Sequence, residues 1–294
     1  MIVTPVLIRS RRSLDEHIEY IRQNNIKKAI IAAEDIRFLE QCPSLEYVWI
    51  IPSITAENFD YAPVYKLQNL KWLNCETMYG LRAMYDVPEK VKVANLDYSR
   101  IQGVRRLVVS GAQGHQNVNM AESVRTLYFA SGFPEADTLS GFVPGKDLQS
   151  LSICQAPIRS LDGIEVAGKL RRLELAHDRR LTDISALASI RESLVYLNIE
   201  ACGKIKDFSV LSELKNLEFL FLKGANRLRD LSFLDDLPNL KHLHLTMNVE
   251  DGDLSICEKL PYVRIQNRRH YSHKNEDLPK NFTNPDEVCP FESI

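Results

Sequence analysis

Long apolar segments are absent from this sequence of 294 residues. No stretch approaches the roughly 20 apolar residues that a helix needs to cross a bilayer. The first residues read MIVTPVLIRSRR, so the short apolar run precedes the arginines, which is the reverse of a secretory signal. The six cysteines include no C-x-x-C pair and no close cluster, which is typical of a reducing compartment. These absences predict a cytoplasmic protein.

An excess of charge of either sign is also absent. The chain has 37 Lys and Arg residues against 39 Asp and Glu residues, a formal net charge of -2. Without a broad basic field, nucleic acid and membrane surfaces are not expected as partners. The composition, 45% hydrophobic and 26% charged, is that of a globular protein. Its length suits one elongated domain or two compact ones.

Residue patterns that perform catalysis are missing too. The sequence has no Ser-His-Asp or Cys-His arrangement. His242, His244, His270, His273 and Cys289 lack the spacing of a closed four-ligand zinc site. We therefore expect no enzyme activity, no cofactor, no metal and no small-molecule substrate. A hydrolase hidden in an insertion or in the tail, dependent on His270 or His273, is the remaining alternative.

What the sequence does contain is a repeat, with apolar residues at positions i, i+3 and i+5. The clearest copies start at Leu148, Leu170, Leu194, Leu217 and Leu240, at intervals of 22 to 24 residues. Other copies start at Ile26, Leu45, Leu70, Val104 and Val124, and a degenerate copy starts at Val263. A fixed period of this length is the signature of a fold in which stacked units share one core.

A second phrase begins 13 residues after the start of four repeats. It reads DISAL at Asp183, DFSVL at Asp207, DLSFL at Asp230 and DLSI at Asp253. A carboxylate could serve acid-base or metal chemistry, but the same carboxylate in every unit, just before a short helical turn, is what capping of that turn requires. We expect these aspartates to be structural.

With both phrases in place, the chain resembles the leucine-rich repeat family. The closest pattern is the bacterial and phosphatase-regulator-like subclass, in which L-x-x-L-x-L is followed by I-x-D-I-S-x-L. The resemblance covers about residues 26 to 265 and implies an α/β solenoid of about 10 to 11 repeats. In that horseshoe a parallel β-sheet lines the concave face, and short helical or irregular segments form the convex face. The family's Asn after the last strand leucine is replaced by Ala156, Asp178, Cys202 and Ala225, and survives only as Asn248.

Alternation along each strand divides the side chains between two faces. The repeat leucines point into the solenoid, so residues two, four and six places after the first leucine should point to the concave face. There we expect exposed aromatic and charged side chains, including Phe219 and Phe221. The insertion near residues 79–95, or the C-terminal tail, could instead cover part of this face. The predicted partner-binding residues are Tyr47, Trp49, Trp72, Arg106, Tyr128, Arg172, Glu174, Tyr196, Asn198, Glu200, Phe219, Phe221, Lys223, His242 and His244.

The two ends of the chain read as caps. Ser13 and Glu16 have capping-box spacing, so residues 1–25 should form an N-terminal cap with a short helix that covers the first strand edge. Residues 26–265 form the predicted solenoid, and residues 266–294 a C-terminal cap or tail. In that tail, Phe282 and Phe291 could dock on the last repeat.

These features predict a non-enzymatic scaffold that recognises another protein on its concave face. Exposed aromatic and arginine side chains are the types that dominate protein-protein binding energy. One form of the hypothesis is a cytoplasmic bacterial protein of the immunity or regulatory type. The alternative is a structural repeat protein that forms a homodimer through the same face.

Overall fold

The computed structural model describes residues 6–9, 13–53, 58–76, 92–93, 95–111, 114–145 and 147–288. The chain divides into two compact units, Met1–Glu135 (unit 1) and Ala136–Ile294 (unit 2). The boundary between them falls inside the predicted repeat region. The predicted limits of the N-terminal cap, the solenoid and the tail stay predictions.

Unit 1 is built on a parallel sheet. Its strands are β1 (Val6–Arg9), β2 (Lys28–Ala33), β3 (Tyr47–Pro52), β5 (Trp72–Glu76), β8 (Arg106–Ser110) and β10 (Thr126–Ala130). Two short parallel pairs join β4 (Asn58–Phe59) to β6 (Lys92–Val93) and β7 (Leu96–Asp97) to β9 (His115–Gln116). The helices are α1 (Leu14–Gln23) and the 3-10 helices Arg37–Gln41, Ala62–Lys66, Tyr98–Arg100 and Val118–Met120.

Unit 2 repeats the same plan. Its parallel strands are β11 (Ser150–Cys154), β12 (Arg172–Ala176), β13 (Tyr196–Glu200), β14 (Phe219–Lys223), β16 (His242–Leu245) and β18 (Tyr262–Ile265). A short pair joins β15 (Arg227–Leu228) to β17 (Asn248–Val249). The helices are α3 (Pro285–Val288) and the 3-10 helices Ile164–Val166, Ser185–Ile190, Ser209–Glu213, Ser232–Asp236, Ser255–Lys259 and Asn275–Asp277.

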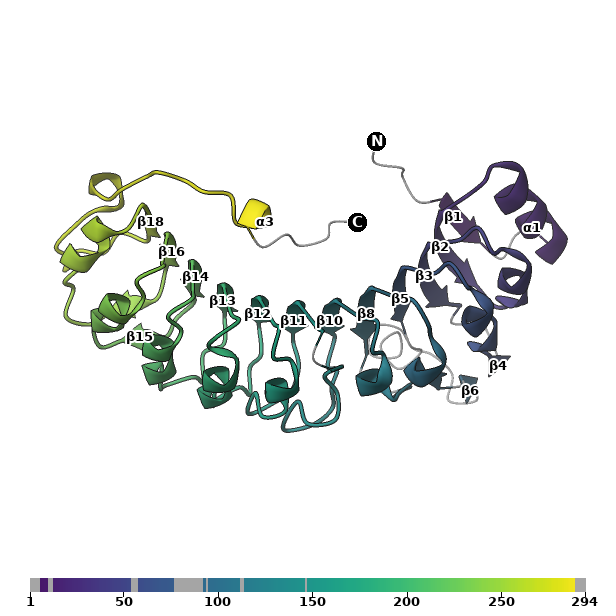
Figure 1. The fold of residues 1–294 in the computed structure, drawn as a ribbon, viewed down its shortest axis with the longest axis horizontal. Coiled ribbons are helices and arrows are strands. Elements are labelled where there is room, and N and C mark those ends of the chain that lie inside the picture. The colour runs from purple at the N-terminus through teal and green to yellow at the C-terminus, as the bar shows by residue number, and fades with distance from the viewer. Residues whose placement is uncertain are drawn as a thin grey trace. The chain divides into compact units, whose positions relative to one another are not determined.

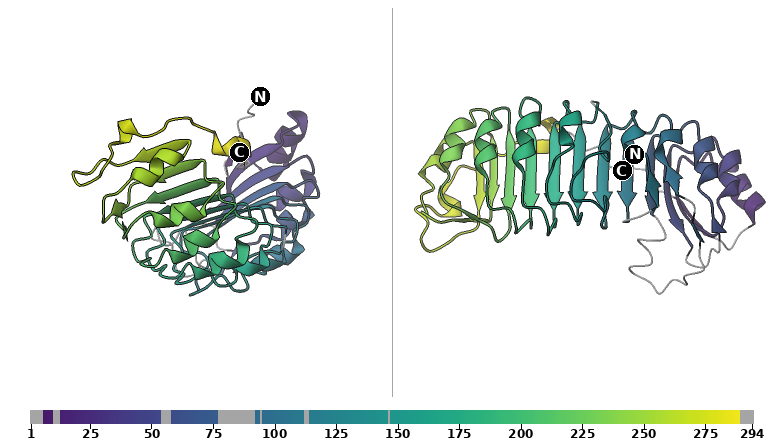
Figure 2. Two further views of the ribbon diagram at one scale, coloured as in Figure 1. Left: turned by 60° about the vertical axis from the view of Figure 1, so that its left-hand side comes forward. Right: turned by 90° about the horizontal axis from the view of Figure 1, so that it is seen from below.

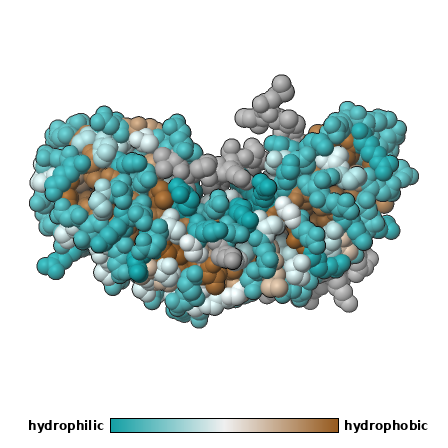
Figure 3. Space-filling model, in the orientation of Figure 1, coloured by the Kyte–Doolittle hydropathy of each residue, from teal (hydrophilic) through white to brown (hydrophobic). Residues whose placement is uncertain are grey.

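The repeat leucines form the core of each unit. In unit 2 the strands pair in register, so Leu173, Leu197, Leu220 and Leu243 stand side by side, each with 0% of its surface exposed. The strands run side by side on one side of the unit and the 3-10 helices lie on the other (Figures 1 and 2). Hydrophobic residues gather between the two layers (Figure 3). The leucine-rich repeat solenoid implied by the sequence is therefore the fold of this chain.

The repeated aspartates cap the turns that precede the 3-10 helices. Each carboxylate accepts a hydrogen bond from the backbone N–H of the serine two residues later. The N···O distances are 2.8 Å at Asp183 and Asp207 and 2.9 Å at Asp230 and Asp253. The structural interpretation of these residues is confirmed.

The N-terminal helix has the predicted capping box, but it does not cover the strand edge. Ser13 accepts from the Glu16 backbone N–H, and the Glu16 side chain accepts from the Ser13 N–H. The edge of β2 is instead paired with β1, a strand that the repeat pattern did not reveal. Helix α1 packs on the first 3-10 helix, where the rings of His17 and Phe38 lie 5.1 Å apart.

The last repeat starts earlier than the sequence analysis placed it. Val263 pairs with Leu243 and Ile265 with Leu245, so the repeat begins at Leu260 and not at Val263. The segment LPYVRI is then a regular copy of the pattern. This shift adds Tyr262 to the side chains that point away from the core.

One asparagine of the turn ladder was also missed. Asn226, one residue after the expected position, donates to the carbonyls of Cys202 (3.1 Å) and Ile205 (2.9 Å) one repeat earlier. Gly224, with a φ of +140°, takes the turn position at which Gln155, His177 and Ala201 also have positive φ, so the extra residue is Ala225. Counting eight residues from the first strand leucine, Leu217, therefore led to Ala225 instead of Asn226.

The segment after the last repeat closes the exposed edge of the unit 2 sheet. Val263 donates to the Pro279 carbonyl and Asn281 to the Pro261 carbonyl, both at 2.9 Å, and Lys280 forms an antiparallel bridge with Tyr262. The predicted docking of Phe282 on the last repeat is confirmed by its contact with Tyr262. Phe291 and most of the predicted insertion near 79–95 lie outside the described residues. Within the described part of the chain, no helix is long and apolar enough to span a bilayer.

Candidate protein-binding face

The sheet face of each unit is the surface of its sheet that points away from the short helices. In unit 2, register pairing arranges its side chains in rows that cross the strands. The first row contains Arg172, Tyr196, Phe219, His242 and Tyr262, and the second row contains Glu174, Asn198, Phe221, His244 and Arg264. A third row pairs Glu200 with Lys223. The eight predicted partner-binding residues of unit 2 from Tyr196 onward therefore lie on one face, together with Arg172 and Glu174.

The prediction that the first row meets water was wrong. Tyr196 is 6% exposed, Phe219 is 0% exposed and His242 is 4% exposed. In-register parallel strands lie about 4.8 Å apart, so large side chains at equivalent positions pack on one another and exclude water. Ring centroids are 6.3 Å apart for Tyr196 and Phe219 and 6.1 Å apart for Phe219 and His242. The first row is a second, aromatic cluster outside the leucine core.

The second row is more accessible and rests on the first. Phe221 is partly buried, and its ring centroid lies 5.0 Å from that of Tyr196 and 4.9 Å from that of His242. His244 is also half-buried, 6.1 Å from Phe221. The two phenylalanines of β14 therefore have different environments. Phe219 is buried in the packing of the first row, whereas Phe221 is partly exposed to solvent.

Charged side chains of the face are held in fixed positions. The Arg172 side chain donates to Glu174 at 2.7 Å, and its guanidinium lies 4.0 Å from the centroid of the Tyr196 ring. Burial lowers the pKa of Arg172, but Glu174, Tyr196 and Asp286 together outweigh it and the net shift is upward. Lys223 donates to Glu200 at 2.8 Å, and this hydrogen bond lowers the pKa of the Glu200 carboxyl.

The two histidines of the face are neutral near pH 7. Burial lowers the pKa of His242 to about 4, with a smaller contribution from His244. Burial also lowers the pKa of His244 to about 4, and the charges of Lys223 and Arg264 act in the same direction. The buried Nδ1 of His242 has no hydrogen-bond partner among the described residues.

The sheet face of unit 1 carries the other predicted residues. Register pairing places Tyr47, Trp72 and Arg106 in one row, and Trp49 and Tyr128 in the next. Lys28 Nζ lies 4.6 Å from the centroid of the Tyr47 ring. Trp72 is only 6% exposed, and its Nε1 has no partner among the described residues. Tyr47, Trp49, Arg106 and Tyr128 are partly exposed.

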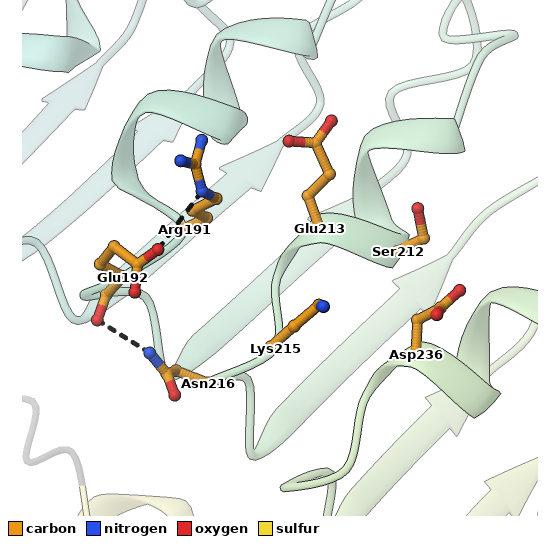
Figure 4. Close-up of a pocket in the computed structure, with 7 residues that line it drawn as sticks. All are labelled: Arg191, Glu192, Ser212, Glu213, Lys215, Asn216 and Asp236. Atoms are coloured by element: carbon orange, nitrogen blue, oxygen red, sulfur yellow. Dashed lines mark hydrogen bonds and ion pairs between the residues drawn. The ribbon is translucent and has the colours of Figure 1, made fainter.

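Elsewhere on unit 2, the described residues form polar grooves. One of about 500 Å³ lies at the strand-entry edge (Figure 4). Arg191 and Glu192 in this groove form an ion pair, with Arg191 Nε 3.3 Å from Glu192 Oε1. Asn216 donates a hydrogen bond to the Glu192 carbonyl at 3.0 Å. Such a groove lacks the apolar lining of a typical small-molecule site. Across the described ranges, no group of three His, Cys, Asp or Glu side chains is arranged to hold a metal ion.

Two residues of the site, Tyr262 and Asp286, were missed by the sequence analysis, and a third, Phe282, was expected on the last repeat but not on this face. Tyr262 was hidden by the misplaced start of the last repeat, and LPYVRI would have revealed it. Phe282 packs edge-on against His242 and Tyr262, with centroids 5.6 and 5.3 Å apart. Asp286 lies 2.8 Å from Arg172. No local pattern could have placed Asp286, because it and Arg172 are 114 residues apart.

Comparison with known proteins shows the fold. No protein-family profile matches this chain, and neither does any curated protein. Among solved structures, an internalin (InlF) from Listeria monocytogenes has a TM-score of 0.58 at 18% identity, covering 88% of this chain and 73% of its own. A leucine-rich repeat protein of Leptospira interrogans has a TM-score of 0.52 at 16% identity, covering 85% and 68%. The leucine-rich repeat domain of APL1B has a TM-score of 0.52 at 16% identity, covering 84% and 72%. These likenesses show that this chain has the leucine-rich repeat fold.

Proposed function

We propose that this protein is a non-enzymatic scaffold that binds a partner protein on its sheet face. The observation that supports this most strongly is the second row of unit 2. Phe221 and His244 are partly exposed on top of a rigid aromatic row and are flanked by the ion pair of Lys223 and Glu200. Aromatic anchors surrounded by charged residues are typical of protein-binding hot spots.

The polar groups of the face also favour a ligand with its own polar groups. Asn198 Oδ1 and His242 Nδ1 are buried, and neither has a hydrogen-bond partner among the described residues. An unpaired buried polar atom costs about 1–3 kcal/mol, so a partner group that satisfies it gains affinity and specificity. A purely apolar partner surface would not do so.

The burial of the first row changes which side chains contribute binding energy. We assign contact with the partner to Phe221, His244 and Lys223 in unit 2 and to Tyr47, Trp49 and Tyr128 in unit 1. Tyr196, Phe219 and Trp72 support them from below. Nucleic acid, membrane and small molecules are not proposed as partners.

The finer form of this proposal is a cytoplasmic bacterial protein of the immunity or regulatory type. Its support is the I-x-D-I-S-x-L form of the repeats, in which all four aspartates cap as that pattern requires. Identification of the captured protein tests it. A toxin whose activity falls when it is mixed with this chain fits the immunity form, whereas a metabolic enzyme contradicts it.

The test of binding is affinity capture from the source cells with wild type, Phe221→Ser and Val166→Ser. Val166 is 47% exposed on a 3-10 helix, on the opposite side of the unit, and serves as the matched control. We expect Phe221→Ser to reduce recovery of the specific partner at least tenfold and Val166→Ser to leave it unchanged. Urea unfolding must show that both variants are folded.

The partner is then purified and the comparison repeated with the two proteins alone. Equal binding by wild type and Phe221→Ser would reject the sheet face of unit 2 as the site. A dimer of this chain that Phe221→Ser dissociates would show that the second copy is the partner.

A further inference from the structure

The C-terminal segment already lies on the sheet face of unit 2. After pairing with β18, the chain leaves the sheet edge and runs over the strands to α3 (Figures 1 and 2). Phe282 reaches the end of the first row, where its ring packs edge-on against His242 and Tyr262. Four residues later, Asp286 reaches the other end of the row and accepts a hydrogen bond from Arg172 at 2.8 Å.

The part of this segment that lies on the face is held less firmly than the part at the edge. Residues 279–281 are tied to β18 by backbone hydrogen bonds at both Pro279 and Asn281. Phe282, in contrast, is 60% exposed, and the side chain of Asp286 is 59% exposed. An aromatic residue that serves only as a cap would be expected to bury most of its ring, because that burial is what stabilises the cap.

The side chain that receives the carboxylate is oriented by contacts within the sheet. Arg172 is itself buried, with its side chain only 10% exposed, and Glu174 and the Tyr196 ring fix its orientation. A preorganised guanidinium binds a carboxylate with little further loss of side-chain entropy. The aromatic seat of His242 and Tyr262 is likewise part of the packed first row.

We propose, building on the proposed function, that residues 279–287 are an internal ligand of this face. The partner protein binds through a segment of the same chemistry, an aromatic side chain followed four residues later by a carboxylate, and it displaces the tail. Aromatic packing and an arginine-carboxylate pair then specify the partner. The attached tail weakens the binding of every ligand that competes for these contacts, so a ligand must supply both to displace it. Such a tail competes at the high effective concentration of a tethered group.

The first experiment needs no partner and uses the full chain. Phe282→Trp places a reporter on the tail, and acrylamide quenching of its fluorescence is measured as the difference from the unsubstituted protein, which contains Trp49 and Trp72. We expect Asp286→Ala, added to the reporter, to increase the quenching constant at least twofold. Glu287→Ala, the neighbouring exposed carboxylate, is the matched control and should not change it.

A synthetic peptide of residues 279–287 is then added to the reporter protein at millimolar concentration. It should displace the attached tail and increase quenching, whereas the same peptide with alanine at the positions of Phe282 and Asp286 should have no effect. Unchanged quenching with Asp286→Ala, or the same response to both peptides, overturns the internal-ligand proposal whatever the partner is.

The final arm connects the tail to the partner. Asp286→Ala should increase capture of the partner at least threefold over wild type and Glu287→Ala, and the peptide should release captured partner. If Phe221→Ser abolishes capture while Asp286→Ala and the peptide leave it unchanged, the face binds its partner but the tail does not resemble it. That result overturns this inference and leaves the proposed function intact.

Discussion

Asp178 offers the sharpest test of how this fold treats a charge in its core. The side chain has 0% of its surface exposed, at the turn where leucine-rich repeats usually carry asparagine. Its Oδ1 accepts from the backbone N–H of Ala156 at 2.8 Å, and its Oδ2 has no hydrogen-bond partner among the described residues. Burial raises the pKa of this carboxyl from 3.8 to about 7, against the effect of hydrogen bonds from Ala156 and Ala176.

The sign of the pH dependence follows from which state holds the proton. Between pH 4 and 7 the unfolded chain has released the proton of Asp178, whereas the folded chain retains it. Rising pH therefore favours the unfolded state across this window. At 1.36 kcal/mol for each pKa unit, the difference between 3.8 and about 7 corresponds to about 4 kcal/mol. That stability is present near pH 4 and is lost above pH 7.

Asp178→Asn removes the titration and keeps the acceptor for Ala156. Asn226 donates to two carbonyls one repeat earlier in a comparable turn, so we expect the amide at position 178 to find acceptors in the same way. We expect the variant to match wild type near pH 4 and to exceed its free energy of unfolding at pH 8 by up to about 4 kcal/mol. Urea denaturation followed by circular dichroism across pH 4 to 8 measures both.

Asp207→Asn is the matched control with the opposite expectation. The Asp207 carboxylate is exposed, and the hydrogen bond from the Ser209 backbone N–H lowers its pKa. Its stabilising contribution is present above pH 4 and is lost as the pH falls through the lowered folded-state pKa, so the variant should be no more stable than wild type at pH 8. If wild type and Asp178→Asn show the same change in unfolding free energy between pH 4 and 8, the reasoning about Asp178 fails.

Two further predictions concern packing. Phe219→Ala should reduce the free energy of unfolding by about 3–5 kcal/mol, because the ring is fully buried, and Phe221→Ala should cost clearly less; equal losses in urea denaturation would contradict the difference between the two rows. Asn226→Ala should cost about 1–3 kcal/mol, because it leaves the buried carbonyls of Cys202 and Ile205 without their donor, and a loss below that range in the same assay would show that the ladder does not support the turns.

The strands and their register were largely readable from the sequence. Each repeat carries its own L-x-x-L-x-L signal, so an error in one copy, such as the start at Val263, does not affect the others. The aspartate caps were equally local, because a carboxylate and the N–H two residues later are neighbours in any such turn. The strand β1 was missed because it lies outside the repeat and has no leucine pattern of its own.

The sequence by itself determined which side of the sheet each side chain takes, because alternation along a strand is a local property of the backbone. Only the tertiary structure decided which of those side chains meet water. Phe219 is hidden because Tyr196 and His242 lie beside it on neighbouring strands, and Arg172, already paired with Glu174, gains a second carboxylate because Asp286 lies over it. The exposed fraction of a side chain depends on contacts with residues from distant parts of the chain, and the sequence of a single repeat does not show those contacts.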